Sequence, residues 1–199
     1  MRTKRIVSVL LLGICLGTFS KFLDYKQGTL PTFFQTLDDL LDVHNFLGGF
    51  APWIVIAVCI AIYSDTAKWA AVRVFVFFVG MVSSYYWYSY FVAGFFPKSY
   101  AMIWVGFTIA SPIFAFLTWY AKGEGTLAWI LSSGIVAVLI NTAFAYGMFY
   151  VSITSWLNVA MLVIGIMVLY TSPKQTGKTI AMGCLFAIIL DNILPFHIW

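Results

Sequence analysis

Charged side chains are scarce in this sequence. Asp, Glu, Lys and Arg make up 9% of its 199 residues, and 62% of the residues are hydrophobic. An average soluble domain is about a quarter charged and about half apolar. So few charges cannot cover a surface that faces water, so most of this surface must face lipid. The length suits a single integral-membrane domain over residues 1–199, without room for a separate soluble domain.

The common catalytic and metal-binding motifs are also absent. The sequence contains no His-Glu-x-x-His, no Gly-x-Ser-x-Gly and no Walker loop for phosphate. Asp38, Asp42 and His44 lie close together but match no known ligand pattern, so we interpret them as the solvated face of a surface helix. The basic residues are dispersed and form no stripe that could follow a nucleic-acid backbone. We therefore predict no catalytic residue, no metal site and no nucleic-acid partner, and any cofactor is unknown.

Cysteine is rare, with three in the chain, at Cys15, Cys59 and Cys184. Their number is odd, and their spacing matches neither a disulfide framework nor a zinc site. Each lies inside an apolar stretch, so we predict three free thiols buried as small hydrophobic side chains. The first twenty residues resemble a secretory signal, but no Ala-x-Ala site follows them, and we expect an uncleaved first helix.

Long apolar runs are what the sequence has in abundance. A helix needs about 20 residues to cross the hydrocarbon core of a membrane. Seven runs are near this length, and two of them, 50–64 and 155–170, are short. The predicted fold class is therefore all-α: a polytopic bundle of about seven transmembrane helices. The runs cover residues 5–22, 50–64, 70–95, 101–121, 127–150, 155–170 and 179–196.

The basic residues fall unevenly between these runs. If every run crosses the membrane, 8 of the 11 basic residues lie on one side. Cytoplasmic loops carry the excess of Lys and Arg. We therefore predict an N-terminus inside, a C-terminus outside, and a place in the cytoplasmic membrane of a bacterium, with the lipid bilayer as partner. The eight residues are Arg2, Lys4, Arg5, Lys68, Arg73, Lys122, Lys174 and Lys178. The other side receives Lys21, Lys26, Lys98, Asp24, Asp38, Asp39, Asp42 and Asp191.

Residues 31–46 do not follow the spanning pattern. Phe33, Leu37 and Leu41 recur at helical spacing, and aspartates gather on the opposite face. This pattern is typical of a short amphipathic helix at the membrane interface. We expect such a helix between the first two transmembrane helices, on the outer surface or as a lid over the bundle.

Two further patterns concern how the helices pack. Gly13 and Gly17 form a Gly-x-x-x-Gly in the first run, which lets another helix of the chain approach closely. Pro112, preceded by Ser111, is expected to kink the fourth helix and to free a backbone carbonyl. Both are interpreted as structural features.

Polar side chains are expected to gather in the outer half of the membrane. A rise of about 1.5 Å per residue places residues 83–90, Asn141 and Asp191 at similar depths on three different helices. Lys21 reaches the same level from the first helix. We predict an outward-facing ligand site there. Its candidate residues are Tyr86, Tyr90, Asn141, Asp191, Asn192 and Lys21.

Each candidate also has a structural alternative. The tyrosines of residues 83–90 either form an interfacial belt or line a pocket for an aromatic or cationic ligand. Asp191 is either a substrate, ion or proton site, with Lys21 as its counter-charge, or a carboxylate that reaches water. Asn141 either contacts a ligand or forms a hydrogen bond between helices.

Three segments stand out in the sequence: residues 20–24 (Ser-Lys-Phe-Leu-Asp), residues 62–64 (Ile-Tyr-Ser) and residues 77–100. Together they resemble a family of uncharacterised bacterial multi-pass membrane proteins of unknown function, common in Gram-positive bacteria. The resemblance covers most of the chain, implies a polytopic membrane protein and supplies no activity. In size and outer-half polarity the chain also looks like the substrate-binding subunits of vitamin-importing energy-coupling-factor systems, which have six helices.

Three functions therefore stay open. The first is a small-molecule binding or transport component. The second is an intramembrane lipid-modifying enzyme that uses Asp191, His44 or Asp42. The third is a non-catalytic partner or stress factor for another membrane protein. A water-accessible cavity that touches Asp191, Asn141 and Tyr86 would favour the first, and a packed interior would favour the third.

Overall fold

The computed structural model describes residues 2–26, 29, 31–147 and 149–193. Over these residues the chain is mostly helical, as predicted, with one two-stranded antiparallel hairpin that the sequence did not predict. The elements in chain order are α1 (Arg2–Lys26), α2 (Thr32–Leu41), α3 (Val43–Gly48), α4 (Ala51–Ile62), α5 (Ala67–Phe91), α6 (Lys98–Trp119), α7 (Thr126–Ala143), β1 (Phe144–Gly147), β2 (Tyr150–Ile153), α8 (Trp156–Leu169) and α9 (Pro173–Ile193).

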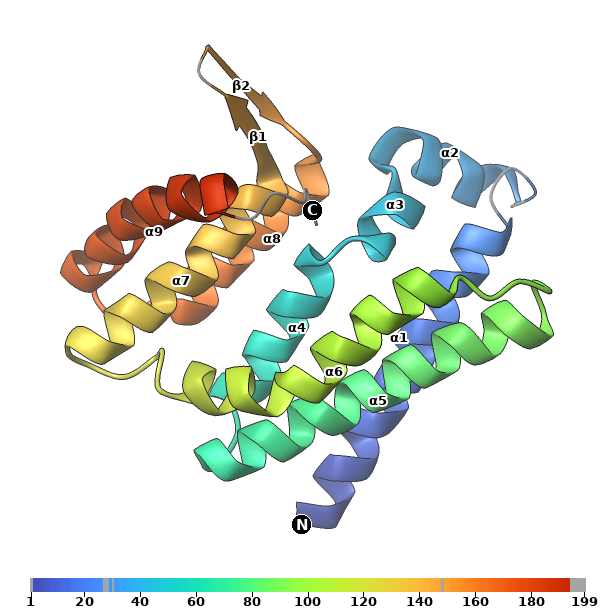
Figure 1. The fold of residues 1–199 in the computed structure, drawn as a ribbon, viewed down its shortest axis with the longest axis horizontal. Helices are drawn as coiled ribbons and strands as arrows, with labels where there is room; N and C mark the ends of the chain where they lie inside the picture. Colours follow the sequence, from blue (N-terminus) through green and yellow to red (C-terminus); the bar gives the residue numbers. More distant parts are fainter. Residues whose placement is uncertain (1, 27–28, 30, 148, 194–199) are drawn as a thin grey trace.

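The long helices form two bundles, one from each half of the chain (Figure 1). In the N-terminal bundle, α5 packs against α1 and α6, and in the C-terminal bundle, α7 packs against α8 and α9. Helix α4 contacts α5, α6 and α8, so it lies between the bundles. Its Trp53 and Ala61 belong to the core of the first bundle, and its Val55 and Val58 belong to the core of the second.

Polar contacts define two ends of the molecule. Arg5 pairs with Asp65 at one end, where Gln175 also donates to the Gly123 carbonyl oxygen. We call this the basic end, because the loops around it carry most of the Lys and Arg residues. The opposite end carries α2 and the hairpin (Figure 1). We call it the acidic end, because four of the seven acidic residues lie in or beside α2, at positions 24, 38, 39 and 42.

Within the described part of the chain, five helices are long and apolar enough to cross a membrane, namely α1, α5, α6, α7 and α9. Helices α4 and α8 are apolar but have only 12 and 14 residues. At about 1.5 Å per residue they rise roughly 18 and 21 Å, which is less than the ~30 Å of a hydrocarbon core. The chain is therefore an apolar helical protein suited to a membrane, with five helices of spanning length where seven were expected.

The prediction of one helical run over residues 127–150 is wrong over its last seven residues. Helix α7 ends at Ala143, and Phe144 begins the hairpin, in which it pairs with Ile153. Aromatic and β-branched residues near Gly147 suit a strand, but their hydropathy is that of a membrane helix, so composition could not separate the two. Helix α9 begins at Pro173, earlier than the predicted 179, because proline is tolerated in a first helical turn. The last three residues of that run lie outside the described residues.

The amphipathic segment predicted over residues 31–46 consists of two short helices. Asp42 has a left-handed backbone (φ 55°) that separates α2 from α3. Asp38 was expected on a solvated face, but it is buried and accepts a hydrogen bond from the His44 backbone N–H at 2.9 Å. The apolar Phe33 and Leu40 are exposed instead, so α2 presents an apolar face outward. The buried Asp38 contact with α3 decides this orientation.

Helices α1 and α5 cross in close contact through glycine. A methyl group at Gly13 would overlap the Phe77 carbonyl oxygen, and one at Gly17 would overlap the Met81 carbonyl oxygen. On the facing helix, a methyl group at Gly80 would lie 2.8 Å from the Leu10 carbonyl oxygen. The Gly-x-x-x-Gly prediction of packing within the chain is confirmed.

Pro112 lies inside α6, which continues through it from Lys98 to Trp119. Proline has no N–H to offer to the carbonyl four residues earlier. Here the Ser111 hydroxyl donates to that carbonyl, on Thr108, at 2.8 Å. The freed carbonyl that the sequence predicted is therefore satisfied by the adjacent serine.

All three cysteines are free, as predicted, but their predicted burial is wrong. Cys15 and Cys184 are exposed on the protein surface, and Cys59 is half-buried. A membrane protein can place apolar side chains against lipid as well as in its interior, so an apolar neighbourhood in sequence does not imply contact with protein.

Candidate functional site

The structure divides the predicted site residues between the two bundles. Lys21 and Tyr86 lie in the N-terminal bundle with Tyr90, and Asn141 lies in the C-terminal bundle with Asp191 and Asn192. Helix α4 packs between the bundles. The six residues therefore form two separate groups.

The N-terminal group surrounds an interruption between α3 and α4. The last carbonyls of α3 have no helical partner to follow them and are bonded by side chains instead. Trp53 Nε1 donates to the Leu47 carbonyl oxygen at 2.9 Å, and Ser20 Oγ donates to the same oxygen at 3.3 Å. The Tyr100 hydroxyl donates to the Gly48 carbonyl oxygen at 2.7 Å. Side chains from α1, α4 and α6 thus hold the interruption together.

A cavity of about 20 Å³ lies beside this interruption. That volume holds one water molecule. Tyr86 lines the cavity and is 8% exposed, and its buried hydroxyl has no hydrogen-bond partner among the described residues. A buried hydroxyl without a partner is costly, so it marks a place where a ligand or a water molecule is expected. We call this the aromatic cavity, after the ring-bearing side chains in its wall: Trp53, Tyr85, Tyr86, Tyr100 and Trp104.

Lys21 lies next to the aromatic cavity with a buried ammonium group. The residue is 4% exposed, and its Nζ forms an ion pair with Asp24 Oδ2 at 2.5 Å. The same Nζ lies 5.3 Å from the centroid of the Tyr85 ring and 5.4 Å from that of Phe95. The ion pair and the two ring faces offset the desolvation of the ammonium. The counter-charge of Lys21 is therefore Asp24 on its own helix, where the sequence suggested Asp191.

The tyrosine stretch of α5 is divided between the protein interior and the surface. Tyr85 and Tyr86 face the protein and line the aromatic cavity. Tyr90 is 59% exposed and packs its ring against Phe91 and Phe96, and Trp87 is similarly exposed. Tyr86 and Tyr90 share a helical face by spacing, but the chain leaves α5 just beyond Tyr90, so no second helix covers it.

The C-terminal group forms a hydrogen-bonded connection between α7, α9 and the hairpin. Asn141 is buried, and its Nδ2 donates to the Ala187 carbonyl oxygen at 3.1 Å. Its Oδ1 accepts a hydrogen bond from the Tyr146 hydroxyl at 2.6 Å. Burial, and secondly the charge of Asp191, raise the pKa of Tyr146 above its usual range. Asn192 is exposed and bonds back to its own helix. The interhelical alternative for Asn141 is thus the one observed.

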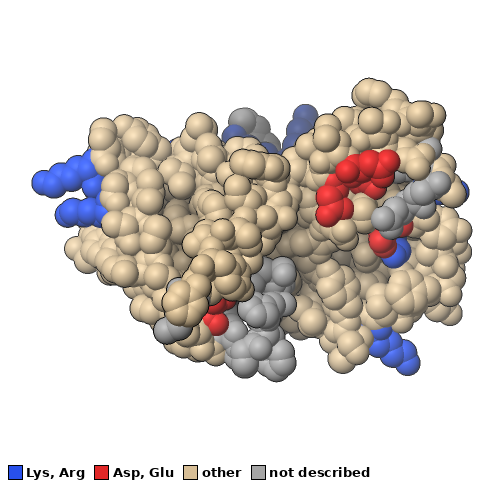
Figure 2. Space-filling model, turned by 90° about the horizontal axis from the view of Figure 1, so that it is seen from above, with Lys and Arg blue, Asp and Glu red and all other residues tan. Residues whose placement is uncertain are grey.

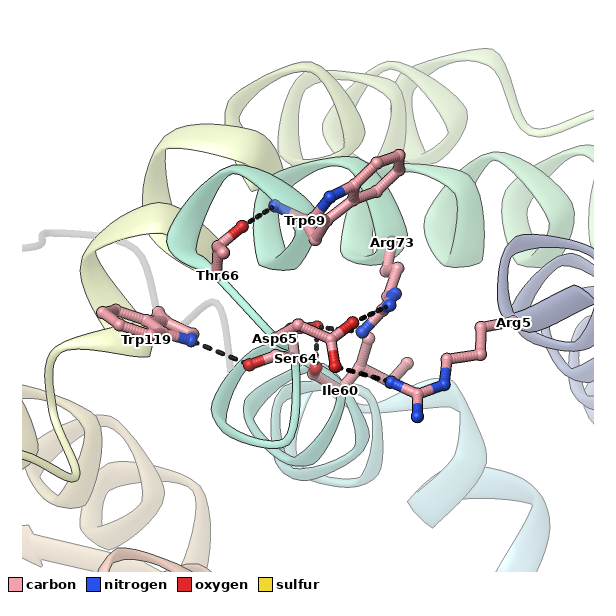
Figure 3. Close-up of polar contacts among 8 residues, drawn as sticks. All are labelled: Arg5, Ile60, Ser64, Asp65, Thr66, Trp69, Arg73 and Trp119. Atoms are coloured by element: carbon pink, nitrogen blue, oxygen red, sulfur yellow. Dashed lines mark hydrogen bonds and ion pairs between the residues drawn. The ribbon is translucent and has the colours of Figure 1, made fainter. Parts of the chain in front are cut away.

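The basic end carries an ion cluster that the sequence did not single out (Figure 3). Arg73 Nη2 pairs with Asp65 Oδ2 at 2.6 Å, and Arg5 Nη1 pairs with Asp65 Oδ1 at 2.7 Å. Arg73 is 4% exposed. Hydrogen bonds from Arg73 and then Arg5 hold the pKa of Asp65 below its usual range. One signal was available, because Asp65 is one of only two acidic residues in the predicted cytoplasmic loops.

Ser64 ties the end of α4 to this cluster. Its hydroxyl accepts a hydrogen bond from Arg73 Nη1 at 3.2 Å and donates to the Ile60 carbonyl oxygen at 2.7 Å. Its own carbonyl accepts from Trp119 Nε1 at 2.9 Å (Figure 3). The turn after α4 is therefore fastened to α1, α5 and α6.

A second, wider pocket opens beside this turn. Its volume is about 440 Å³, and it is lined by Ser64 and Trp119 from the N-terminal bundle and by Leu127 and Ala128 from the start of α7. Lys122 also lines it. We call it the basic-end pocket. The chain thus has a small closed cavity near one end of α4 and a large pocket near the other.

Two of the three residues considered for lipid chemistry lie together, and the third is apart from them. His44 Nδ1 lies 3.5 Å from Asp42 and 2.8 Å from the buried Asp38, whereas Asp191 lies in the other bundle. Among the described residues, no group of three or more His, Cys, Asp or Glu side chains could hold a metal ion.

Comparison with known proteins gives one match. Residues 2–194 match the model of a family of unknown function (DUF6518). No curated protein and no solved structure matches the chain. The prediction of an uncharacterised family that spans most of the chain is confirmed.

Proposed function

The chain belongs to the DUF6518 family of unknown function, and we propose that it is a small-molecule transport component of a cell membrane. In this proposal α1 and α4 to α9 all cross the bilayer, with α3 and α4 together forming one interrupted crossing. Helix α2 lies in the outer interface with its exposed Phe33 and Leu40 against lipid. Substrate passes along α4, between the aromatic cavity inside the N-terminal bundle and the basic-end pocket where the bundles meet.

The observation that carries the proposal is the contact between the two short apolar helices. Helix α4 is the second crossing of the triple α1, α4 and α5, and α8 is the second of the triple α7, α8 and α9. The two short helices meet where the bundles meet. In secondary transporters, short or glycine-interrupted segments at corresponding positions of two halves mark the substrate site. The glycines at 48 and 49, just before α4, supply such an interruption.

The distribution of charge supports an orientation. The loops at the basic end carry Lys68, Lys122 and Lys174 in addition to the arginines of the ion cluster. By the positive-inside rule this end faces the cytoplasm. The basic-end pocket then opens inward, and the aromatic cavity lies toward the outside. The inward pocket is the wider of the two spaces, which supports assigning the present arrangement to an inward-facing conformation in this proposal.

Helix α4 connects the two spaces directly. Trp53 near its start lines the aromatic cavity, and Ile62 at its end lines the basic-end pocket. A tilt of α4 against the C-terminal bundle would widen one space as it narrows the other. The ion pairs of Asp65 hold the far end of α4 against the N-terminal bundle and away from Ala128. We propose that these pairs stabilise the inward-facing conformation.

Thiol accessibility tests the proposal without knowledge of the substrate. The three native cysteines are replaced by alanine, and a single cysteine is placed either in the basic-end pocket, at the exposed Leu127 (Leu127→Cys), or in the aromatic cavity, at the buried Ser20 (Ser20→Cys). Vesicles of each orientation are treated with a membrane-impermeant maleimide. We expect Leu127→Cys to react from the cytoplasmic side and Ser20→Cys to react slowly from the outside.

The Asp65→Asn substitution in both backgrounds then tests movement. We expect slower labelling of Leu127→Cys and faster labelling of Ser20→Cys, each by severalfold, because the inward-facing conformation loses its ion pairs. Phe149→Cys, on the exposed tip of the hairpin, serves as a control that should not change. Equal labelling with and without Asp65 would mean that α4 does not exchange access, and would favour a static structural role.

A further inference from the structure

We infer that the ligand of the aromatic cavity is a compact organic cation, such as an alkylammonium group. This inference rests on the proposed function, because it names the class of molecule that the proposed site takes. Its first basis is the composition of the wall. Five of the ten lining side chains carry Trp or Tyr rings, from α4, α5 and α6. The face of an aromatic ring is negative and attracts a cation within about 6 Å of its centre.

The second basis is that an ammonium is already stabilised beside these rings. The buried Nζ of Lys21 lies within 5.4 Å of the Tyr85 and Phe95 ring centroids. It is removed from water and held by Asp24, whose side chain is still 43% exposed. An ammonium of a ligand in the aromatic cavity would meet ring faces of the same kind, including that of Tyr85. Because Asp24 neutralises Lys21, the lysine leaves these rings available to a second cation.

The third basis is the charge around the entrance. The chain has a net charge of +4, but the part of the acidic end that belongs to the N-terminal half carries four aspartates against three lysines, Lys21, Lys26 and Lys98. Figure 2 shows acidic side chains gathered on this part of the surface, and Asp39 and Asp42 of the α2 region are exposed. An acidic surface raises the local concentration of cations and repels anions.

Other ligand classes fit the wall less well. A sugar or a polar metabolite needs several convergent hydrogen-bonding groups. Most hydroxyls here are occupied, because Ser20 and Tyr100 donate to the carbonyls of Leu47 and Gly48. Tyr86 is the one hydroxyl in this wall without a partner among the described residues. An anion would have to take Lys21 from Asp24. A neutral aromatic molecule is the remaining competitor, and the experiment below separates it from a cation.

The closed cavity of about 20 Å³ holds a water molecule and not an alkylammonium, so entry requires the wall to move. The segment between α3 and α4 is suited to this movement. A methyl group at Gly48 would meet no atom within 4 Å, so the Cα side of this residue is open, and the movement must break the hydrogen bond from the Tyr100 hydroxyl to the Gly48 carbonyl oxygen. Movement of α3 away from Tyr100 would open the aromatic cavity toward the acidic end.

The test is a calorimetric titration of the full chain in dodecyl maltoside micelles, with two matched pairs of probes. Choline is compared with its neutral isostere 3,3-dimethyl-1-butanol, and benzylammonium is compared with benzyl alcohol. We expect each cation to bind about tenfold more tightly than its neutral partner, because only the cation gains from the ring faces. Phosphatidylcholine is left out of the micelles because its headgroup would compete.

Variants locate the binding. Trp104→Leu removes a ring from the wall and should weaken binding of the cations by about tenfold. Trp87→Leu removes an exposed ring from α5, outside the cavity, and should leave it unchanged. Tyr86→Phe keeps the ring and should keep the preference for cations. If Trp104→Leu does not fold, Tyr100→Leu, at a residue that is 37% exposed, replaces it.

The outcomes are distinct. Equal binding within each pair overturns the inference of a cation and leaves a neutral aromatic ligand. Binding of cations that Trp104→Leu and Tyr100→Leu do not weaken places the site elsewhere and also overturns it. The absence of binding by all four probes overturns it as well, and the proposed function is then judged by thiol labelling alone, which uses no ligand.

Discussion

The crossing of α1 and α5 allows a sharp test of the fold, with opposite effects expected from the same substitution at two glycines. At Gly13, alanine would place a methyl group into the Phe77 carbonyl oxygen and 3.0 Å from the Met81 backbone nitrogen. Both neighbours are backbone atoms, so no side chain can rotate out of the way. At Gly134 in α7, the same methyl group meets no atom within 4 Å.

The magnitudes follow from packing. Replacement of Gly by Ala in a helix, where space allows, stabilises by about 0.4–1 kcal/mol. Gly134→Ala should show this gain. At Gly13 the helices must separate by roughly 1 Å to restore ordinary contact distances, and such overpacking costs about 1–3 kcal/mol. Separation would also weaken the hydrogen bond from Ser84 Oγ to the Ile14 carbonyl oxygen, worth about 0.6 kcal/mol in a membrane helix pair. The two variants should therefore differ by about 2–4 kcal/mol.

The measurement is reversible unfolding in mixed micelles as dodecyl sulfate is added, followed by tryptophan fluorescence and circular dichroism. Wild type, Gly13→Ala and Gly134→Ala are compared at the same lipid and detergent ratio. Gly13→Ala should unfold first and Gly134→Ala last. If Gly13→Ala is as stable as Gly134→Ala, then α1 does not pack on α5 through this face, and the assignment of α1 to the N-terminal bundle fails.

Three further predictions concern the polar networks. Asp65 has a lowered pKa in the folded protein, so its contribution to folding stability is present above about pH 4 and is lost as the pH falls through the folded pKa. The melting temperature should therefore fall more between pH 7 and pH 3 for wild type than for Asp65→Asn. Parallel curves for the two proteins would contradict the ion pairs. Asn141→Ala removes the hydrogen bond to the Ala187 carbonyl and leaves the Tyr146 hydroxyl without its acceptor. It should lower the free energy of unfolding by about 1 kcal/mol in the same assay, and the double variant Asn141→Ala, Tyr146→Phe should recover part of this loss. Tyr146 has a raised pKa, so the contribution of its protonated phenol to folding stability is complete below about pH 10 and is lost as the pH rises further. The difference in ultraviolet absorbance between wild type and Tyr146→Phe should show a phenol that titrates above pH 10. A midpoint at or below pH 10 would refute the burial of Tyr146.

Much of the helical content could be predicted because hydropathy is a local property. Each of the seven apolar runs contains a helix, and 31–46 contains two short ones. The residues at which the helices begin and end were predicted less well. The C-terminal end of α7 was missed because Phe144 and its neighbours are apolar whether they form a helix or a strand, and only the cross-strand partner decides between these.

The candidate site was predicted in part. Depth along each helix correctly grouped Lys21 with the tyrosines of α5, since both are near the same end of parallel helices. Depth says nothing about which helices are neighbours. Tyr86 and Asn141 were therefore placed in one site although they lie in different bundles. The Arg5, Asp65 and Arg73 cluster was missed for the same reason, because its members are up to 68 positions apart and no spacing rule connects them.

The sequence by itself determined the solvent of this protein, the approximate position of each apolar helix, and the separation of basic from acidic residues along the chain. These follow from composition and periodicity, which act within a few residues. Only the tertiary structure decided that the helices form two bundles with α4 between them, that Lys21 pairs with Asp24, and that Tyr86 faces a cavity while Tyr90 faces outward. Those choices depend on which surfaces fit together at atomic distance, and in lipid, where all the helices are equally apolar, hydrophobicity cannot make them.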